Sequence, residues 1–213
     1  MKETYLNLLR RVWRLIFSPA SEWNAIRTEQ KPWERVEKEY LLPLWSLLIG
    51  SMLIRIGYLS LFVEYEYSKS TFSADCIETV AATLNIIVCF YVAVLVRSKA
   101  EKWYSRYPKF YILPLRVNRD LDFTSICITY CSTLMVVTQV VEFFVPVAEV
   151  FYWPVNMYAA YIFWTCYWAL CHDERSSYEP QPLHFTAMTF VLVYGLPMGL
   201  LGVVKMIIKF ALQ

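Results

Sequence analysis

Charged residues and glycine are both scarce in this sequence of 213 residues. Charged side chains make up 18% of it, and only five glycines are present. A soluble domain carries about 25% charged residues and interrupts its apolar runs sooner. Hydrophobic residues reach 58% here, with a mean hydropathy of +0.39. The composition therefore excludes an ordinary soluble domain and indicates a membrane protein.

Motifs of enzyme chemistry are missing as well. The sequence contains no H-E-x-x-H, glycine-rich phosphate loop, G-x-S-x-G or C-x-x-C. Cys171, His172, Asp173 and Glu174 are the residue types of a nucleophile, a base and an orienting acid, but neighbouring positions do not converge in a helix. We therefore expect no catalytic site, metal site or cofactor. A meeting of Cys171, His172 and His184 beside a pocket would instead favour an intramembrane enzyme.

The six cysteines lie inside or at the edge of apolar runs. A disulfide framework is typical of small secreted domains with polar, loop-rich sequences. In an apolar run, cysteine behaves as a small hydrophobic residue. We expect these thiols to be buried and unpaired.

Long apolar runs are what the sequence does contain. The longest has 47 residues, and its only charged residues are Glu142 and Glu149, with Pro146 between them. A hydrocarbon core of about 30 Å takes about 20 helical residues, and a segment in lipid must satisfy its own backbone groups. Because proline cannot donate to a helix, the run predicts a hairpin of two spans, 124–145 and 147–170.

Three further runs complete a predicted set of five spans. The fold class we expect is an all-α polytopic membrane protein, with spans at about 41–63, 74–96, 124–145, 147–170 and 184–204. Residues 1–40 then form an N-terminal segment of cytoplasmic or interfacial helices, including a charged helix over 33–40. Residues 41–213 form the transmembrane domain.

Lysine and arginine are distributed unevenly along the chain. Eight of the twenty lie in residues 1–40 and seven in residues 97–119. Connections rich in these residues stay in the cytoplasm. This places the N-terminus and the loop 97–123 in the cytoplasm, and five spans then place the C-terminus outside.

Residues 3–17 have the pattern of a basic amphipathic helix. Apolar side chains recur on one face: Leu6, Leu9, Val12 or Trp13, and Ile16. Arg10, Arg11 and Arg14 lie away from that face. The pattern predicts a helix along a membrane surface, and packing against the bundle is the compatible alternative. No uninterrupted hydrophobic region or small-x-small site follows, so we expect no cleavable signal peptide.

A second N-terminal helix is predicted from its start signal. Ser18 has the residue type of an N-cap, and proline at position 19 suits the first helical position. We expect a helix from Pro19 to about Glu29, with Trp23 and Ile26 on one side.

The block Ser-Pro-x-x-Glu-Trp-x-x-Ile, between a basic helix and five apolar spans, resembles bacterial members of the Yip1 domain family. Its positions are Ser18, Pro19, Glu22, Trp23 and Ile26. The resemblance covers nearly the whole chain and implies a five-helix integral protein of the inner membrane with a cytoplasmic N-terminus. It does not imply a catalytic site. Eukaryotic members have longer N-termini and are associated with small GTPases of vesicle traffic. This chain has only about 40 residues before its first span, so the resemblance does not carry that partner role over to it.

Polar residues inside the predicted spans form a candidate cluster: Arg55, Glu78, Asn85, Gln139 and Glu142. An ionisable residue in a span costs about 2.5–3.5 kcal/mol on insertion scales and faces the bundle interior. A rise of about 1.5 Å per residue places Arg55, Glu78 and Glu142 in the same half of the bilayer. We expect Arg55 to pair with one of the two carboxylates. The layer either joins the helices or lines a path for a solute.

These features predict a non-enzymatic protein that organises the membrane or binds proteins at its cytoplasmic face. The expected contact surface is residues 1–40 with the loop 97–123, and the lipid bilayer is a further partner. Nucleic acid is not expected, because anionic headgroups explain the basic loop. Gly195 and Gly199 favour a close helix contact within the bundle or in a homo-oligomer. The alternative function is a transporter or channel for a small solute.

Overall fold

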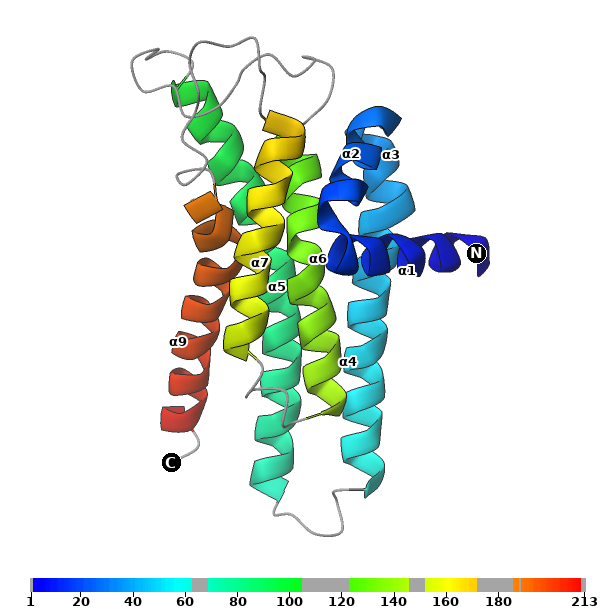
Figure 1. Cartoon of the computed structure of the whole chain (residues 1–213). Coiled ribbons are helices and arrows are strands. Elements are labelled where there is room, and N and C mark those ends of the chain that lie inside the picture. Colours follow the sequence, from blue (N-terminus) through cyan, green and yellow to red (C-terminus); the bar gives the residue numbers. More distant parts are fainter. Residues whose placement is uncertain are drawn as a thin grey trace.

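The computed structural model describes residues 2–62, 69–104, 123–145, 152–171, 186–187 and 189–211. All regular structure in these ranges is helical, which confirms the all-α class. The helices form an upright bundle, and one N-terminal helix lies across its side (Figure 1).

The N-terminal segment contains three helices: α1 (Lys2–Phe17), α2 (Pro19–Glu29) and α3 (Trp33–Val36). The bundle is built from α4 (Leu42–Phe62), α5 (Lys69–Tyr104), α6 (Phe123–Phe144), α7 (Tyr152–Cys166) and α9 (Leu196–Ala211). Three π-helical turns extend these elements: η1 (Glu37–Leu41) before α4, η4 (Tyr167–Cys171) after α7 and η5 (Val191–Gly195) before α9.

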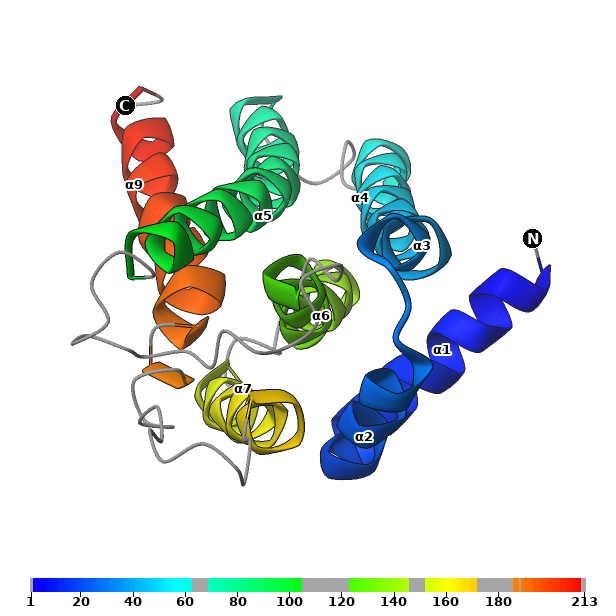
Figure 2. The ribbon, with the colours of Figure 1, turned by 90° about the horizontal axis from the view of Figure 1, so that it is seen from above.

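Helix α6 is the centre of the bundle. Seen from above, the other helices surround it (Figure 2). Its apolar stretch Ser125–Phe144 is 72% buried, against 28% for Trp33–Leu61 and 33% for Ser73–Val96. The stretch is rich in small and hydroxyl-bearing residues, which allow helices to approach closely. Helices α4 and α5 therefore direct much of their apolar surface outward.

Three helices are long and apolar enough to cross a membrane: Trp33–Leu61, Ser73–Val96 and Ser125–Phe144. They coincide with the first three predicted spans. The apolar helix Val193–Val203 is shorter. Large side chains on the outer faces of α4 and α5, such as Leu53, Leu61 and Leu95, are more than half exposed. An apolar exterior of this kind suits contact with lipid rather than water.

One predicted boundary is wrong. Helix α5 continues past Val96 to Tyr104, into the expected loop 97–123. Residues 97–104 contain no glycine or proline, so nothing there interrupts the helical hydrogen bonds. The helical run Trp33–Leu61 passes without a break from the charged helix expected over 33–40 into the first apolar span.

Several expected connections lie outside the described residues. They are the rest of the loop at 105–122, the turn beyond Val145 at 146–151 and the linker at 172–185. The linker includes His172 and His184 of the intramembrane-enzyme alternative considered from the sequence. In the described part of the chain, no group of three His, Cys, Asp or Glu residues could hold a metal ion.

Among the described residues, Gly195 and Gly199 make no close helix contact within the bundle, and a contact in a homo-oligomer stays a prediction. A Cβ at Gly199 would meet no atom within 4 Å, and one at Gly195 would meet only Val191 of its own helix. Spacing alone identified these glycines, but α9 turns them away from the other described helices. The π turn η5 ends just before Pro197, where proline removes one backbone donor and the helical register adjusts.

Candidate functional site

Helix α1 carries two separate apolar rows. Leu8 and Leu15 are 2% and 1% exposed and pack into the core. A second row is more than half exposed: Leu6, Leu9, Trp13 and Phe17. The sequence analysis identified Leu6 and Leu9 but missed Leu8 and Leu15. A helix with two apolar faces does not show one clear repeat of apolar residues, so the second face was not recognised. Helix α1 therefore both packs on the bundle and presents apolar surface outward.

Helix α2 begins at Pro19, directly after Ser18, as predicted. The Ser18 side chain makes no capping hydrogen bond, so the proline and the backbone mark this start. Trp23 is completely buried and Ile26 is 8% exposed. The Trp23 ring meets Tyr130 of α6 edge-on, with 5.9 Å between ring centroids. These motif residues therefore attach α2 to the bundle.

Helix α2 also contacts the end of the α7 segment. It packs against α7 and η4, and Nη1 of Arg27 donates to the Ala169 carbonyl at 3.1 Å. Tyr158 of α7 donates to the Ile16 carbonyl at the end of α1. The junction between α1 and α2 is thereby held against α7.

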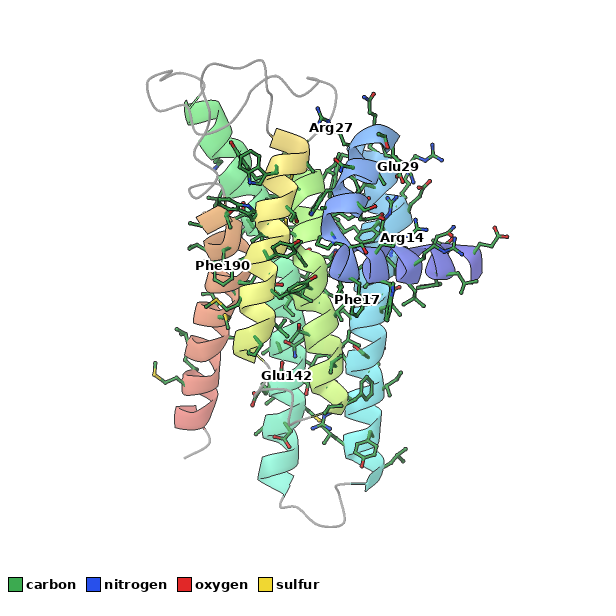
Figure 3. The ribbon with its side chains drawn as sticks, viewed as in Figure 1. Arg14, Phe17, Arg27, Glu29, Glu142 and Phe190 are labelled. Carbon is green, nitrogen blue, oxygen red and sulfur yellow. The ribbon has the colours of Figure 1, made fainter. Side chains whose placement is uncertain are left out.

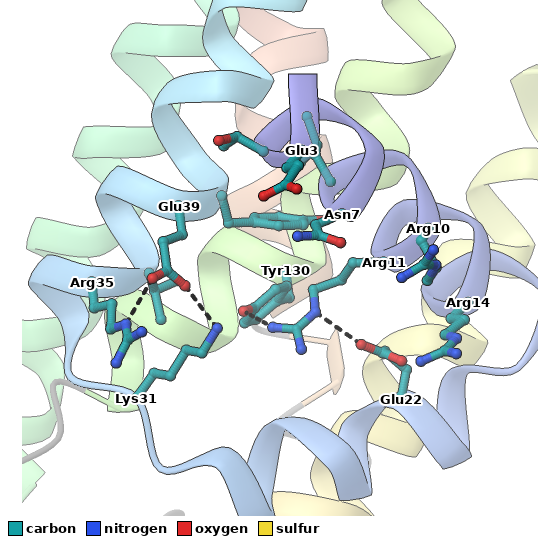
Figure 4. Close-up of a pocket in the computed structure, with 14 residues that line it drawn as sticks. Glu3, Asn7, Arg10, Arg11, Arg14, Glu22, Lys31, Arg35, Glu39 and Tyr130 are labelled. Atoms are coloured by element: carbon teal, nitrogen blue, oxygen red, sulfur yellow. Dashed lines mark hydrogen bonds and ion pairs between the residues drawn. The ribbon is translucent and has the colours of Figure 1, made fainter. Parts of the chain in front are cut away.

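Arg11 connects three helices from the centre of the N-terminal segment. Its Nε lies 3.0 Å from Oε1 of Glu22, and its Nη1 donates to Oη of Tyr130 at 2.9 Å (Figure 4). Its Nη2 pairs with Glu29. Its guanidinium also lies 5.7 Å from the centre of the Tyr130 ring. Glu22 is 3% exposed, so this ion pair neutralises a buried carboxylate of the motif.

The Arg11–Glu29 pair shifts the pKa of both groups. Burial acts to raise the pKa of Glu29, but the Arg11 hydrogen bond and the charges of Arg11 and Lys31 outweigh it and lower this pKa. Burial acts to lower the pKa of Arg11, and its contacts with Glu29 and Tyr130 raise that pKa instead. Both groups are charged at neutral pH.

A second ion-pair group joins the loop after α2 to the start of the first apolar helix. Nζ of Lys31 and Nε of Arg35 each lie 2.7 Å from a carboxylate oxygen of Glu39. Next to it, Oη of Tyr40 and Oγ1 of Thr133 share a buried hydrogen bond of 2.7 Å. Arg35 and Glu39 are four residues apart, a spacing that indicates an ion pair on one face of a helix and could have been recognised in the sequence.

A cavity of about 520 Å³ lies between α1, the loop after α2, the α3–η1 segment and α6. We call it the charged cavity. Five cations and three carboxylates line it: Arg10, Arg11, Arg14, Lys31, Arg35, Glu3, Glu22 and Glu39. Its remaining lining is Thr4, Asn7, Leu8, Val36, Tyr40 and Tyr130. The sequence analysis named the arginines of α1 only as a polar face and did not predict that these segments enclose a cavity.

The polar cluster predicted from the sequence lies elsewhere. Figure 3 shows Glu142 toward the end of the bundle opposite Glu29. None of the five cluster residues lines the charged cavity. Gln139 is buried in α6 at 8% exposure.

One contact places a member of this cluster. Nδ2 of Asn85 donates to the Pro197 carbonyl at 2.7 Å and so joins α5 to α9. The pairing of Arg55 with Glu78 or Glu142 stays a prediction. The joint role of the five residues stays a prediction.

The fold and the charged cavity define a helical protein with apolar helices suited to a membrane and a cationic N-terminal segment. Comparison with protein-family models, curated proteins and solved structures gave no match. The resemblance to the Yip1 domain family therefore stays a prediction from the residues that carry it.

Proposed function

We propose that this chain is a non-enzymatic, multi-pass membrane protein of Yip1-like type that binds partners through its N-terminal segment. The orientation of α1 is the observation that carries the proposal. The helix lies across the bundle (Figure 1), and its apolar row Leu6, Leu9, Trp13 and Phe17 is exposed. Arg10 and Arg14 of the same helix line the charged cavity. This is the arrangement of a helix that rests in a membrane surface.

The apolar side of α1 faces the part of the bundle in which α4 continues toward Phe62. Figure 3 shows Phe17 on the side facing the lower half of α4 and Arg14 on the opposite side, toward α2. Oη of Tyr5 and Oγ of Ser46 lie 2.7 Å apart, which sets the level of α1 on α4. From Ser46 to Phe62, α4 extends about 24 Å below that level, close to the thickness of a hydrocarbon core.

The proposed topology has five spans, a cytoplasmic N-terminus and an external C-terminus in an inner membrane. The three long apolar helices support the first part of this topology, and the concentration of lysine and arginine in residues 1–40 and 97–119 supports its orientation. In this orientation the charged cavity opens at the cytoplasmic surface. The proposed partners are membrane lipids and proteins that meet residues 1–40 there.

The depth of α1 in the membrane is the direct test. Spin labels at Trp13 and Arg14 of the full chain in lipid nanodiscs would report access to oxygen, which partitions into lipid, and to a water-soluble nickel complex. We expect the label at position 13 to be accessible to oxygen and the label at 14 to nickel. Lys38, an exposed residue of η1, provides the aqueous reference. Equal nickel access at positions 13 and 14 would contradict the proposal.

Orientation is tested separately. A reporter enzyme that is active only outside the cytoplasm should be active when fused after Gln213 and inactive when fused before residue 1. Activity at both ends, or at neither, would rule out an odd number of spans.

A further inference from the structure

Two of the cations that line the charged cavity, Arg10 and Arg14, project from successive turns of α1 (Figure 4). Neither forms an ion pair with another described residue. The other three cations are already paired: Arg11 with Glu22 and Glu29, and Lys31 and Arg35 with Glu39. Arg10 and Arg14 are therefore the lining cations that form no ion pair with a described carboxylate.

Their spacing makes this arrangement unfavourable in the protein alone. Like charges four residues apart on a helix repel by a few tenths of a kcal/mol. Arg11 lies between them in the sequence, and its own charge is fixed by Glu22 and Glu29. An anion held between the two guanidinium groups would remove the repulsion and use the forked geometry in which arginine binds phosphate.

The remaining lining indicates what such an anion carries. Thr4, Asn7 and Glu3 add hydroxyl, amide and carboxylate groups on the same helix, which can hydrogen-bond to hydroxyl groups of a ligand. The volume of about 520 Å³ falls in the range of small-molecule sites and exceeds the need of a bare phosphate. The lining thus suits a phosphate joined to a hydroxyl-bearing group.

We propose that the charged cavity binds the phosphate of an anionic, hydroxyl-bearing headgroup through Arg10 and Arg14. This inference rests on the proposed function, which places the arginine row of α1 at the level of lipid headgroups. Basic side chains at that level attract anionic lipids. A lipid headgroup and a free phosphate compound share the same chemistry, so the experiment separates these two sources.

Binding is measured on the purified full chain in a neutral detergent. The probes are short-chain phosphatidylglycerol, short-chain phosphatidylcholine and inorganic phosphate, each titrated while the thermal midpoint and dissociation constant are followed. We expect phosphatidylglycerol to bind more tightly than the other two. The double variant Arg10→Gln/Arg14→Gln should weaken that binding about a hundredfold, because each of the two charge-assisted hydrogen bonds contributes about one factor of ten.

A matched control removes the same charge outside the cavity. Lys38→Gln/Lys99→Gln changes two exposed lysines that line no part of it, and this variant should bind phosphatidylglycerol like the wild type. Equal losses in both double variants would show only a general charge effect and overturn the proposal. Unchanged binding in Arg10→Gln/Arg14→Gln would overturn it too.

The remaining outcomes identify the source of the phosphate. If inorganic phosphate binds as tightly as phosphatidylglycerol and its binding requires both arginines, that result would support the phosphate site. It would identify the ligand of the site as a soluble phosphate compound instead of a lipid. Because binding is measured in detergent, it does not depend on the depth of α1. Failure of the spin-label test would therefore refute the membrane-surface role while leaving the phosphate result to stand or fall separately.

Discussion

Nη1 of Arg11 donates a 2.9 Å hydrogen bond to Oη of Tyr130, a residue 119 positions further along the chain. The first residue lies on α1 and the second on the central helix α6. Because Arg11 also pairs with Glu22 and Glu29 of α2, this one side chain joins the N-terminal segment to the core of the bundle. The position of the charged cavity depends on that junction.

Replacing Arg11 should destabilise the whole N-terminal segment. Arg11→Leu leaves the carboxylate of Glu22 buried without its cation, and we expect the free energy of unfolding to fall by about 3 kcal/mol. An SDS titration of the protein in mixed micelles would measure it. Lys38→Leu, a change at an exposed lysine, should shift the result by less than about 0.5 kcal/mol.

A second substitution separates the ion pair from general disruption. In Arg11→Leu/Glu22→Leu the buried carboxylate is gone, so much of the lost stability should return. If the double variant is less stable than Arg11→Leu by the full cost of Glu22→Leu alone, the two residues are not coupled and this interpretation is wrong.

Acid should weaken the Arg11–Glu29 contact. The pKa of Glu29 lies below its ordinary value of 4.5 in the folded protein, so the ionised carboxylate stabilises the fold fully above pH 4.5. That contribution is lost as the pH falls through the lower folded value. Thermal midpoints measured from neutral to acidic pH should decline less steeply for Glu29→Gln than for the wild type.

The control for this pH effect is Glu34→Gln. Glu34 is exposed on α3 and takes part in no ion pair among the described residues. The thermal midpoint of Glu34→Gln should change with pH in the same way as that of the wild type. A Glu29→Gln curve that also coincides with the wild type would show that the pair contributes no pH-dependent stability.

The buried Tyr40–Thr133 hydrogen bond should be worth more than the exposed Tyr5–Ser46 bond. Both bonds are 2.7 Å long. The first joins η1 to α6, and the second joins α1 to α4. Tyr40→Phe should lower the free energy of unfolding by about 1 kcal/mol, because a buried hydroxyl loses its partner. Tyr5→Phe should cost less than half of that. Equal costs for the two variants would argue against a buried position for Tyr40.

Asn85 should contribute to stability through α9. In Asn85→Leu the 2.7 Å bond to the Pro197 carbonyl is lost, and hydrogen bonds between membrane helices are worth about 0.6–1.7 kcal/mol. We expect a loss in that range in the SDS titration. Thr138→Val on α6 is the comparison, since the Thr138 hydroxyl bonds only within its own helix. A loss for Asn85→Leu no larger than for Thr138→Val would contradict the link between α5 and α9.

Helix positions were largely readable from local pattern. The start of α2 at Pro19, the helix over 33–40 and the span 124–145 each follow from a residue type or a run length that acts within a few turns. Burial of Trp23 and Ile26 followed from their spacing on one helix face. The end of α5 was not readable, because a charged stretch without glycine or proline is compatible with either helix or loop.

The contacts of the candidate site could be predicted much less well from the sequence. The sequence showed the arginines of α1 only as a polar face. Arg11 differs from Arg10 and Arg14 because Glu22 and Tyr130 lie next to it, and their positions depend on the tertiary structure. The same holds for Asn85, whose partner on α9 is 112 positions away. A pairing of Arg55 with a carboxylate was inferred from depth alone, and depth does not specify the direction in which a helix face points.

By itself the sequence determined the class of protein and the approximate helices. Composition and run length decide whether a segment prefers lipid, and a proline such as Pro19 marks where a helix begins. The tertiary structure alone decided which face of each helix meets another. Only there does α6 become the central helix, and only there do Arg10 and Arg14 line a cavity with Lys31, Arg35 and Glu39. The physical reason is that hydrophobicity and helix propensity act locally along the chain, whereas an ion pair or a cavity needs segments from distant positions to meet.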